Sequence, residues 1–183
     1  MSAAEPAAVR LPVGVRVVPL TPHADDRGVF TEIHRANWGV PTPVQWNVVH
    51  SRPGTLRGVH VHLRHWDYLV VVAGQCVFGL CDLRSGSATR RLATTITLGG
   101  EQPSALVLPP GVAHGFYFPV ASTHVYGVTH YWDLADELGC RFDDPELGIA
   151  WPTHDVRLSP RDRSLPSLRE LLALLAMQAD VTA

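Results

Sequence analysis

The sequence lacks the features that mark secreted and membrane-spanning proteins. Its three cysteines, Cys76, Cys81 and Cys140, form no C-x-x-C pair, so they indicate buried, reduced thiols rather than a disulfide framework. The N-terminal stretch M-S-A-A-E-P-A-A-V-R has neither the basic start nor the apolar run of a signal peptide. The longest aliphatic run, residues 69–73, is far too short to cross a bilayer. We therefore expect a cytoplasmic protein with no membrane contact.

The chain also lacks an excess of charge of either sign. The chain has 15 basic and 17 acidic residues, which gives a net charge of −2. The basic residues are spread along the chain and form no stripe, whereas nucleic-acid-binding surfaces cluster them. Nucleic acid is therefore not an expected partner.

Helix-breaking residues, in contrast, are abundant. The 183 residues include 15 glycines and 15 prolines, and 46% of the chain is hydrophobic. So many breaks favour short strands and turns, and this length is enough for one domain with a sizeable core. We expect residues 1–12 to form a flexible lead-in and residues 13–183 to form a single all-β domain.

Segments of strand composition recur along the chain with turn signals between them. They cover residues 13–20, 29–34, 44–49, 68–72, 76–81, 91–98, 105–108 and 124–131. The stretch T-P-H-A-D-D-R-G at 21–28 is interpreted as a turn, and A-G-Q at 73–75 indicates a hairpin. Strands at this spacing predict a sandwich or jelly roll.

One helix is predicted near the end of the chain, over residues 167–178. Its leucines, at 168, 171, 172 and 175, lie on one face of a helix and form an apolar stripe. Ser164 or Ser167 could cap its start. The stripe predicts a helix that packs against the domain.

A dense cluster of histidines follows Gly58. His60 and His62 are two residues apart, so both side chains point to the same side of a strand. With Asp67 and His114 they offer three imidazoles and a carboxylate, which can bind a divalent transition metal. Two other interpretations stay open: a strand-borne histidine can act as a general base, or these residues can simply fill the mouth of a barrel.

The spacing around this cluster resembles the two metal motifs of the cupin superfamily, whose fold is a double-stranded β-helix jelly roll. The pattern is G-x-H-x-H-x(4)-D-x(6)-G followed by P-x-G-x-x-H. It departs from those motifs at two positions. Asp67 stands where a glutamate is usual, and Phe118 stands where an asparagine is usual.

A longer series of motifs runs from about residue 25 to residue 166. In order, these are D-D-R-G-V-F-T-E, V-Q-W-N, L-R-G-V-H, C-D-L-R, P-P-G-V-A-H-G-F, V-Y-G-V-T-H-Y, D-D-P-E-L-G-I-A-W-P and L-S-P-R-D. Together they resemble the dTDP-4-dehydrorhamnose 3,5-epimerases and related dTDP-4-keto-6-deoxysugar epimerases of the cupin superfamily. The resemblance implies a cupin-type double-stranded β-helix jelly roll with a C-terminal helix. It also implies a homodimer, a dTDP-sugar substrate, and no metal or organic cofactor.

The resemblance also implies roles for particular residues. His60 corresponds to the catalytic base, Asp162 to the carboxylate that pairs with it, and Tyr126 to the acid on the opposite face of the sugar. A keto group at C4 acidifies the protons at C3 and C5, so one base and one acid on opposite faces can invert either centre. The positions that match contacts to the nucleotide sugar are Arg27, Glu32, Gln45, Asn47, Arg57, His114, Glu137 and Arg161.

One departure from the family bears directly on the chemistry. The family has a lysine near the C4 oxygen where this chain has Asp67, and a glutamine where it has His62. Loss of a good oxyanion stabiliser costs roughly 3–4 kcal/mol in comparable enzymes. Arg64 or His65 could replace the lysine, or the reaction could differ from a double epimerisation.

A third explanation is a metal bound by His60, His62, Asp67 and His114, acting as the Lewis acid. It conflicts with the role of His60, because a histidine that ligates a metal cannot also be the free base. The leading hypothesis is an isomerase that epimerises a dTDP-4-keto-6-deoxysugar at C3 and/or C5. The alternatives are a metal-dependent cupin enzyme and a non-catalytic sugar-nucleotide-binding cupin.

Overall fold

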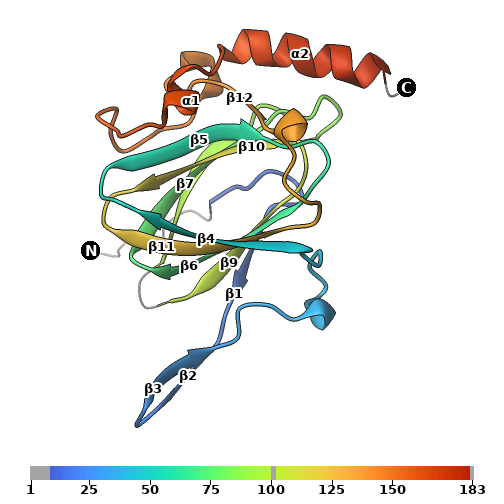
Figure 1. The fold of residues 1–183 in the computed structure, drawn as a ribbon. Coiled ribbons are helices and arrows are strands. Elements are labelled where there is room, and N and C mark those ends of the chain that lie inside the picture. Colours follow the sequence, from blue (N-terminus) through green and yellow to red (C-terminus); the bar gives the residue numbers. More distant parts are fainter. Residues whose placement is uncertain (1–8, 100–101, 182–183) are drawn as a thin grey trace, which may run out of the picture.

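Two antiparallel sheets face each other in the computed structural model, which describes residues 9–99 and 102–181 (Figure 1). The first sheet has the order β1 (Arg16–Pro19), β9 (Ser104–Leu108), β6 (Asp67–Ala73), β11 (Ser122–Val128) and β4 (Gln45–Ser51). The second has the order β12 (Leu138–Gly139), β5 (Thr55–Val61), β10 (Val112–Phe118), β7 (Gln75–Asp82) and β8 (Ala93–Gly99). The expected all-β jelly roll is confirmed.

The apolar core lies mainly between the sheets. Leu69 and Val71 of β6 pack against Phe78 and Leu80 of β7, and all four side chains are buried. The intervening residue Val70 of β6 is buried on the outer face of its sheet. The run Tyr68–Val71 is continuously apolar because both of its faces are covered.

Two segments at the start of the chain differ from the sequence-based expectation. β1 is shorter than the predicted strand because Val13 and Gly14 form a turn, which the bond from Val15 N to Pro12 O closes. Leu11 packs against the core and Pro12 is buried, so the packed chain begins within the predicted lead-in. Residues 1–8 of that lead-in lie outside the described residues.

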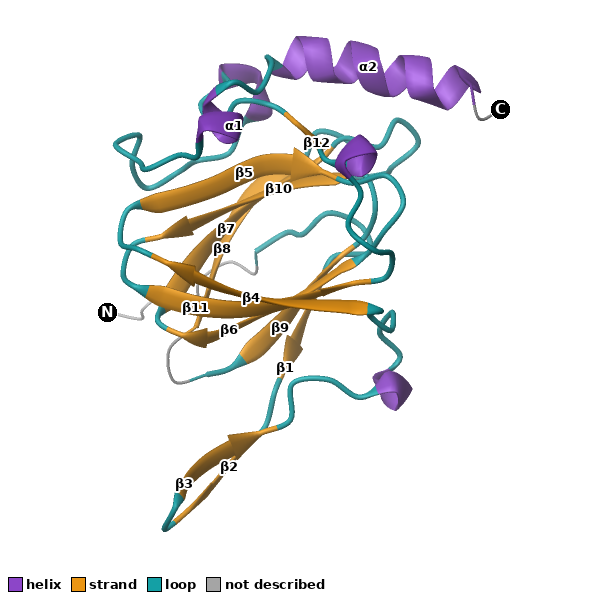
Figure 2. Ribbon diagram, viewed as in Figure 1, coloured by secondary structure: helices purple, strands orange, loops and turns teal. Residues whose placement is uncertain are grey.

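The predicted turn at 21–28 is instead most of a hairpin. β2 (Pro22–Asp25) pairs with β3 (Gly28–Thr31), and the hairpin projects away from the two sheets (Figure 2). A short 3-10 helix, Ala36–Trp38, follows it. The turn prediction failed because the flanking residues also pair as strands.

The C-terminal helix is confirmed, with slightly different bounds. α1 (Pro160–Arg163) is one turn, and α2 (Leu168–Val181) lies over the outer face of the second sheet (Figure 1). Ser167 and Glu170 form a reciprocal cap, because Ser167 N donates to Glu170 Oε2 and Glu170 N donates to Ser167 Oγ. Within 9–99 and 102–181, no helix has the length and apolar character needed to cross a membrane.

Candidate active site

A cavity of about 260 Å³ opens between the two sheets. Both sheets and the α1 segment contribute to its wall. The lining residues are Asn47, Val49, Arg57, His60, His62, His65, Asp67, Leu69, His114, Phe116, His124, Tyr126, Val128, Trp132, Glu137, Ser159, Arg161 and Asp162. Titratable side chains are concentrated here, as is typical of active sites.

A bulge in β5 brings two histidines opposite each other. The ladder between β5 and β10 pairs His114 with His60, but Phe116 with Arg57, so β5 holds one extra residue. Gly58 lies at this point with φ of 110°, and a Cβ there would lie 2.8 Å from the backbone oxygen of His114. Glycine is therefore required for the approach that sets His60 in the pocket wall.

The His60 side chain pairs with Asp162, which is 102 residues further along the chain. The distance from His60 Nε2 to Asp162 Oδ1 is 2.8 Å. Asp162 lies in the first turn of α1, where its backbone N donates to Ser159 Oγ. Burial raises the pKa of Asp162, but the bond to His60 and its nearby charge lower it more, so the carboxyl is ionised.

Tyr126 faces the cavity from the other sheet. It lies on β11, whereas His60 lies on β5, so the two side chains approach the cavity from opposite walls. Burial, Asp67 and Glu137 raise the pKa of Tyr126, so its phenol keeps its proton at neutral pH.

Five of the residues expected to bind a nucleotide sugar line the cavity beside these three. They are Asn47, Arg57, His114, Glu137 and Arg161. Arg161 Nη1 donates to Glu137 Oε2 at 3.0 Å, and Arg57 Nε donates to Ser51 Oγ at 3.1 Å. Asn47 Nδ2 is buried without a hydrogen-bond partner among the described residues.

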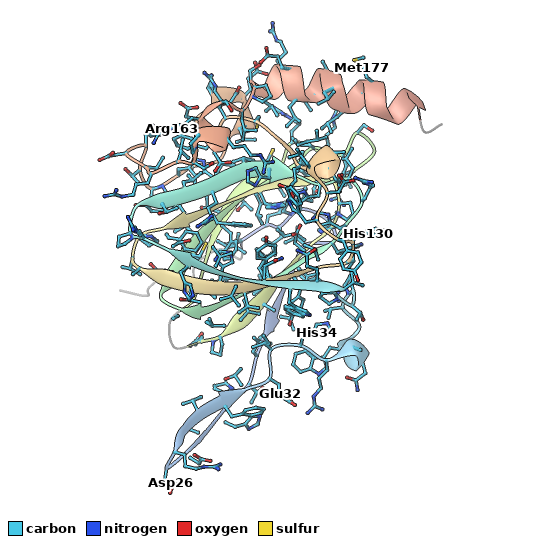
Figure 3. The ribbon with its side chains drawn as sticks, viewed as in Figure 1. Asp26, Glu32, His34, His130, Arg163 and Met177 are labelled. Atoms are coloured by element: carbon cyan, nitrogen blue, oxygen red, sulfur yellow. The ribbon has the colours of Figure 1, made fainter. Side chains whose placement is uncertain are left out.

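The other expected contacts lie outside the cavity of their own chain. Arg27 pairs with Asp25 near the tip of the hairpin, and Glu32 pairs with Arg35 beyond β3 (Figure 3, where Asp26 and Glu32 are labelled). Gln45 donates to Asn47 Oδ1 and accepts a bond from the backbone N of Trp132. Arg27 and Glu32 are too distant to join this pocket in a single chain.

The position of the family's lysine is occupied by a buried group of histidines and carboxylates. His62 stacks on His65, with ring centroids 4.1 Å apart. The Asp67 carboxylate lies 3.7 Å from His65 Nε2 and 3.9 Å from His114 Nε2. Burial raises the pKa of Asp67, but His65, His114 and His62 lower it more, so the net direction is downward.

The predicted metal set is only partly assembled. Among the described residues, His62, Asp67 and His114 place one ligand atom each within 4.8 Å of one another, and so do His62, His65 and Asp136. His60 belongs to neither group, because its Nε2 is bonded to Asp162. The four-residue set is therefore corrected: His60 stands apart from the other three.

Arg64 does not replace the missing lysine. Its guanidinium donates to Asp133 at 2.6 Å and is more than half exposed, outside the residues that line the cavity. His65 does line the cavity, and burial of its ring lowers its pKa, which disfavours the charged form. Asp67, Asp136 and Glu137 outweigh that effect and raise its pKa overall.

Two residues of the site were missed from the sequence: His124, which lines the cavity, and Asp136, which lies behind the histidines. His124 is two residues before Tyr126 on β11, so strand alternation places both on the cavity side, and that signal was available. Asp136 belongs to a short 3-10 helix, Leu134–Asp136, and reaches the histidines only through the fold. No local spacing in the sequence marks it.

Comparison with known proteins gives a consistent result. The family model for dTDP-4-dehydrorhamnose 3,5-epimerase matches residues 11–170. The dTDP-4-dehydrorhamnose 3,5-epimerase of Sinorhizobium fredii is 32% identical over 168 residues, which cover 86% of each protein. A dTDP-4-dehydrorhamnose 3-epimerase of Streptomyces niveus is 34% identical over 172 residues, which cover 87% of this chain and 83% of that protein.

The fold agrees with the sequence comparison. A dTDP-6-deoxy-D-glucose-3,5-epimerase from Legionella pneumophila, solved in complex with dTDP-4-keto-L-rhamnose, superposes with a TM-score of 0.79. It is 31% identical, and the match covers 86% of this chain and 91% of the other. These likenesses confirm the cupin-type jelly roll. The chain belongs to the dTDP-4-dehydrorhamnose 3,5-epimerase family.

Proposed function

We propose that this protein is an isomerase that epimerises a dTDP-4-keto-6-deoxysugar at C3 and/or C5. One observation carries the proposal: a His60–Asp162 pair and a protonated Tyr126 approach one cavity from opposite sheets. Inversion of a carbon next to a ketone needs a base on one face and an acid on the other. The relatives named above supply the sugar class.

His60 is the proposed base. Its Nε2 is held by Asp162, which leaves Nδ1 to take a proton from C3 or C5. The electron pair left on carbon moves onto the C4 oxygen, giving an enolate. The ionised Asp162 stabilises the imidazolium that forms, much as a buried aspartate supports histidine in other acid–base pairs.

Tyr126 is the proposed acid. Return of a proton from its phenol to the opposite face of the same carbon inverts the centre and restores the ketone. Each positioned acid or base typically contributes about 10²–10⁴-fold to the rate. Neither transfer needs an organic cofactor.

The cavity is suited to the sugar part of such a substrate. Its volume lies just below the range of about 300–1,000 Å³ that is typical of pockets for whole ligands, so part of the nucleotide extends beyond it. The unpartnered Asn47 Nδ2 can donate to a sugar oxygen, because buried donors normally find an acceptor. Arg57 and Arg161 can pair with the diphosphate, and His114 and Glu137 border the same space.

We propose a homodimer as the active form. The β2–β3 hairpin leaves Val29 and Phe30 more than 60% exposed, and an isolated two-stranded hairpin is marginally stable in water. Packing of the hairpin on a second copy covers these side chains and carries Arg27 and Glu32 toward the partner's cavity. Gln45 borders the same rim. The free thiols of Cys76, Cys81 and Cys140 support a cytoplasmic location.

Hydrogen exchange with solvent tests the function directly. In deuterated water the wild-type protein is expected to place deuterium at C3 or C5 of a dTDP-4-keto-6-deoxyglucose, as read by mass spectrometry and NMR. His60→Asn is expected to slow this exchange by about 10²–10⁴-fold. Tyr126→Phe is expected to retain deuterium uptake from the side of the sugar that faces His60. The rate at which it forms the inverted product is expected to fall by a similar factor.

The exposed His130→Asn is the matched control and should leave both rates unchanged. Binding of the dTDP-sugar without any deuterium uptake by the wild type would establish a non-catalytic binding protein instead. Deuterium at one carbon only would identify a single-centre enzyme, as the name of the Streptomyces niveus relative describes for that protein.

A further inference from the structure

The cavity is also lined by a group of two histidines and an aspartate that has no part in the proton transfer proposed for His60 and Tyr126. His62, Asp67 and His114 are all buried and contribute to the cavity lining. His62 follows the last residue of β5, Asp67 is the first residue of β6, and His114 lies in β10. None of the 183 residues is a lysine, so no amine in this chain can take the place of the family's lysine.

The two imidazoles are oriented as metal ligands are. His62 Nδ1 lies 3.1 Å from the backbone oxygen of Asp136, and His114 Nδ1 lies 3.0 Å from the backbone oxygen of Val112. A carbonyl oxygen only accepts, so each ring carries its proton on Nδ1. In a neutral ring of this tautomer, Nε2 carries the lone pair that can bind a metal. Histidines that bind metals almost always donate the other ring N–H in this way.

The third proposed ligand is the carboxylate of Asp67, which is too far from His114 for a direct hydrogen bond. Asp67 Oδ2 and His114 Nε2 are 3.9 Å apart, beyond hydrogen-bond length, although both groups are buried. In a tetrahedral site with bonds of about 2.0–2.1 Å, two ligand atoms are about 3.4 Å apart. A shift of roughly half an ångström, within the freedom of side chains, would bring these two atoms to that separation.

The second group, His62, His65 and Asp136, is less suited to a metal. Both carboxylate oxygens of Asp136 already accept backbone bonds, Oδ1 from Leu63 N and Oδ2 from Arg64 N. His62 presents Nδ1, its protonated nitrogen, toward Asp136. This group therefore holds the 62–65 turn in place, and the His62–Asp67–His114 group is the one with free ligand atoms.

We propose that His62, Asp67 and His114 bind one divalent transition-metal ion in the cavity. Two imidazoles and one carboxylate, with the remaining positions open toward the cavity, suit Zn²⁺, Fe²⁺ or Co²⁺. The site removes the conflict over His60, because that residue keeps its bond to Asp162 and stays free as the base. This chain thus departs from the metal-free expectation of its family.

The role of the ion rests on the proposed function. A cation at this position supplies positive charge near the C4 oxygen, where negative charge develops when a proton leaves C3 or C5. The lysine of the family supplies the same sign of charge. The presence of Asp67, which would oppose an enolate by itself, is then explained as a ligand.

Binding of Co²⁺ alone tests the site without reference to activity. Untagged protein is freed of metal with a chelator, and Co²⁺ is then added while its visible absorption and bound amount are measured. The wild type is expected to bind one Co²⁺ per chain, with an absorption change that indicates nitrogen ligands. Asp67→Asn and His114→Gln are expected to weaken binding by more than about 100-fold, the upper range for loss of an outer partner.

Two neighbouring variants are the matched controls. His60→Asn and His65→Gln should each keep one Co²⁺ per chain, since neither residue belongs to the proposed ligand set. The proposal is overturned if the wild type binds no Co²⁺, if binding survives Asp67→Asn, or if either control abolishes it. Circular dichroism and thermal unfolding of each variant confirm that the protein is folded.

Deuterium exchange then separates the site from the reaction. With the ion as charge stabiliser, metal-free wild type should exchange at least 10-fold more slowly than protein reloaded with Zn²⁺ or Co²⁺, while His60→Asn binds metal and exchanges slowly in both forms. Equal rates with and without metal would overturn the role of the ion. Metal binding with no exchange at all would overturn the epimerase proposal and leave the metal site standing.

Discussion

At the scale of the residue, the histidines of the cavity differ in role because their ring nitrogens meet different partners. His60 is bonded through Nε2 to the carboxylate of Asp162 at 2.8 Å, which fixes the orientation of its ring. His114 is bonded through Nδ1 to a backbone oxygen, and burial lowers its pKa to about 4, so this ring is neutral. In the roles we propose, the same type of side chain is a base in one position and a metal ligand in the other.

His124 provides a pH-dependent test of this environment. It is buried, stacks on Phe118 and Tyr126, and has a pKa lowered to about 4, first by burial and then by Arg57. A neutral histidine with a depressed pKa stabilises the fold fully above pH 6.5, the value of the unfolded chain. This stability is lost as the pH falls toward 4, because the unfolded chain then binds the extra proton.

We expect His124→Phe to reduce the slope of the unfolding free energy against pH between 6.5 and 4. The reduction should approach about 1.4 kcal/mol per pH unit, the value for one proton. Urea unfolding at a series of pH values measures it. The exposed His130→Phe is the control and should keep the wild-type slope. An unchanged slope in His124→Phe would show that folding does not lower the pKa of His124.

In the sequence, the residues of the His60–Asp162 pair are marked only by the family motifs. Nothing in the local spacing joins two side chains that are 102 positions apart, since the turn α1 that carries Asp162 is placed by the fold. The histidine pair at 60 and 62 was visible from strand alternation alone. The alternative that placed His60 in a metal set rested on this alternation, which gives the face of a strand and not the partner of each nitrogen; the structure pairs His60 with Asp162 instead.

At the scale of the element, several family motifs serve packing rather than chemistry. Gly79 of β7 and Gly115 of β10 are cross-strand partners, and the indole of Trp151 lies against both. The indole nitrogen of Trp151 donates to the backbone oxygen of Phe142 at 3.0 Å. Gly115 and Trp151 each belong to a family motif, and Gly79 and Gly115 together provide the space that the indole fills.

Gly79→Ala is expected to destabilise the fold. A Cβ at this position would lie 2.4 Å from Trp151 Cη2 and 2.6 Å from Ile149 Cγ2, so the indole must move. Overpacking of this kind typically costs about 1–3 kcal/mol, measured here by denaturant unfolding. Gly86→Ala is the matched control, since its Cβ would meet no atom within 4 Å, and it should change stability by less than about 0.5 kcal/mol. Equal stability of Gly79→Ala and the wild type would contradict this account.

Strand positions were easier to predict from the sequence than the hairpin at 22–31. Strands inside the sheets carry buried apolar residues, such as Leu69 and Leu106, whose pattern is local. Most of β3 lies in the strand predicted over 29–34, whereas β2 was interpreted as a turn. Every residue of β2 is exposed in its own chain, so no hydrophobic alternation marks that strand. An element stabilised by another molecule leaves a weak pattern in the sequence of one chain.

At the scale of the whole molecule, the hairpin decides whether one chain is sufficient for the site. The cavity of a single chain is lined by His60, Asp162 and Tyr126. Arg27 lies in the turn of the projecting hairpin and Glu32 directly after β3, and neither lines the cavity (Figure 3, where Glu32 is labelled). If each hairpin reaches the cavity of a partner, one complete site is built from two copies.

Mixed dimers test this arrangement. His60→Asn removes the base and keeps the hairpin, whereas Arg27→Ala keeps the base and removes the hairpin contact. In a hybrid of the two, the Arg27→Ala chain has an intact cavity and receives an intact hairpin from its partner. Co-expression should therefore restore deuterium exchange to about a quarter of the wild-type rate, since random pairing gives hybrids half of the time and each hybrid has one complete site of two.

Each variant expressed alone is expected to be at least about 10-fold less active than the wild type, since Arg27 would contribute one charge-assisted bond of about 1.5–3 kcal/mol. If Arg27 served the cavity of its own chain, the hybrid would contain no complete site and mixing would restore nothing. A monomer in sedimentation experiments would exclude the arrangement altogether.

Asp25→Asn provides the control for the hairpin itself: it disrupts the pair with Arg27 in the free chain and leaves the guanidinium available to the partner. Activity of that variant close to wild type would therefore place the contribution of the hairpin in Arg27 and not in the shape of its turn.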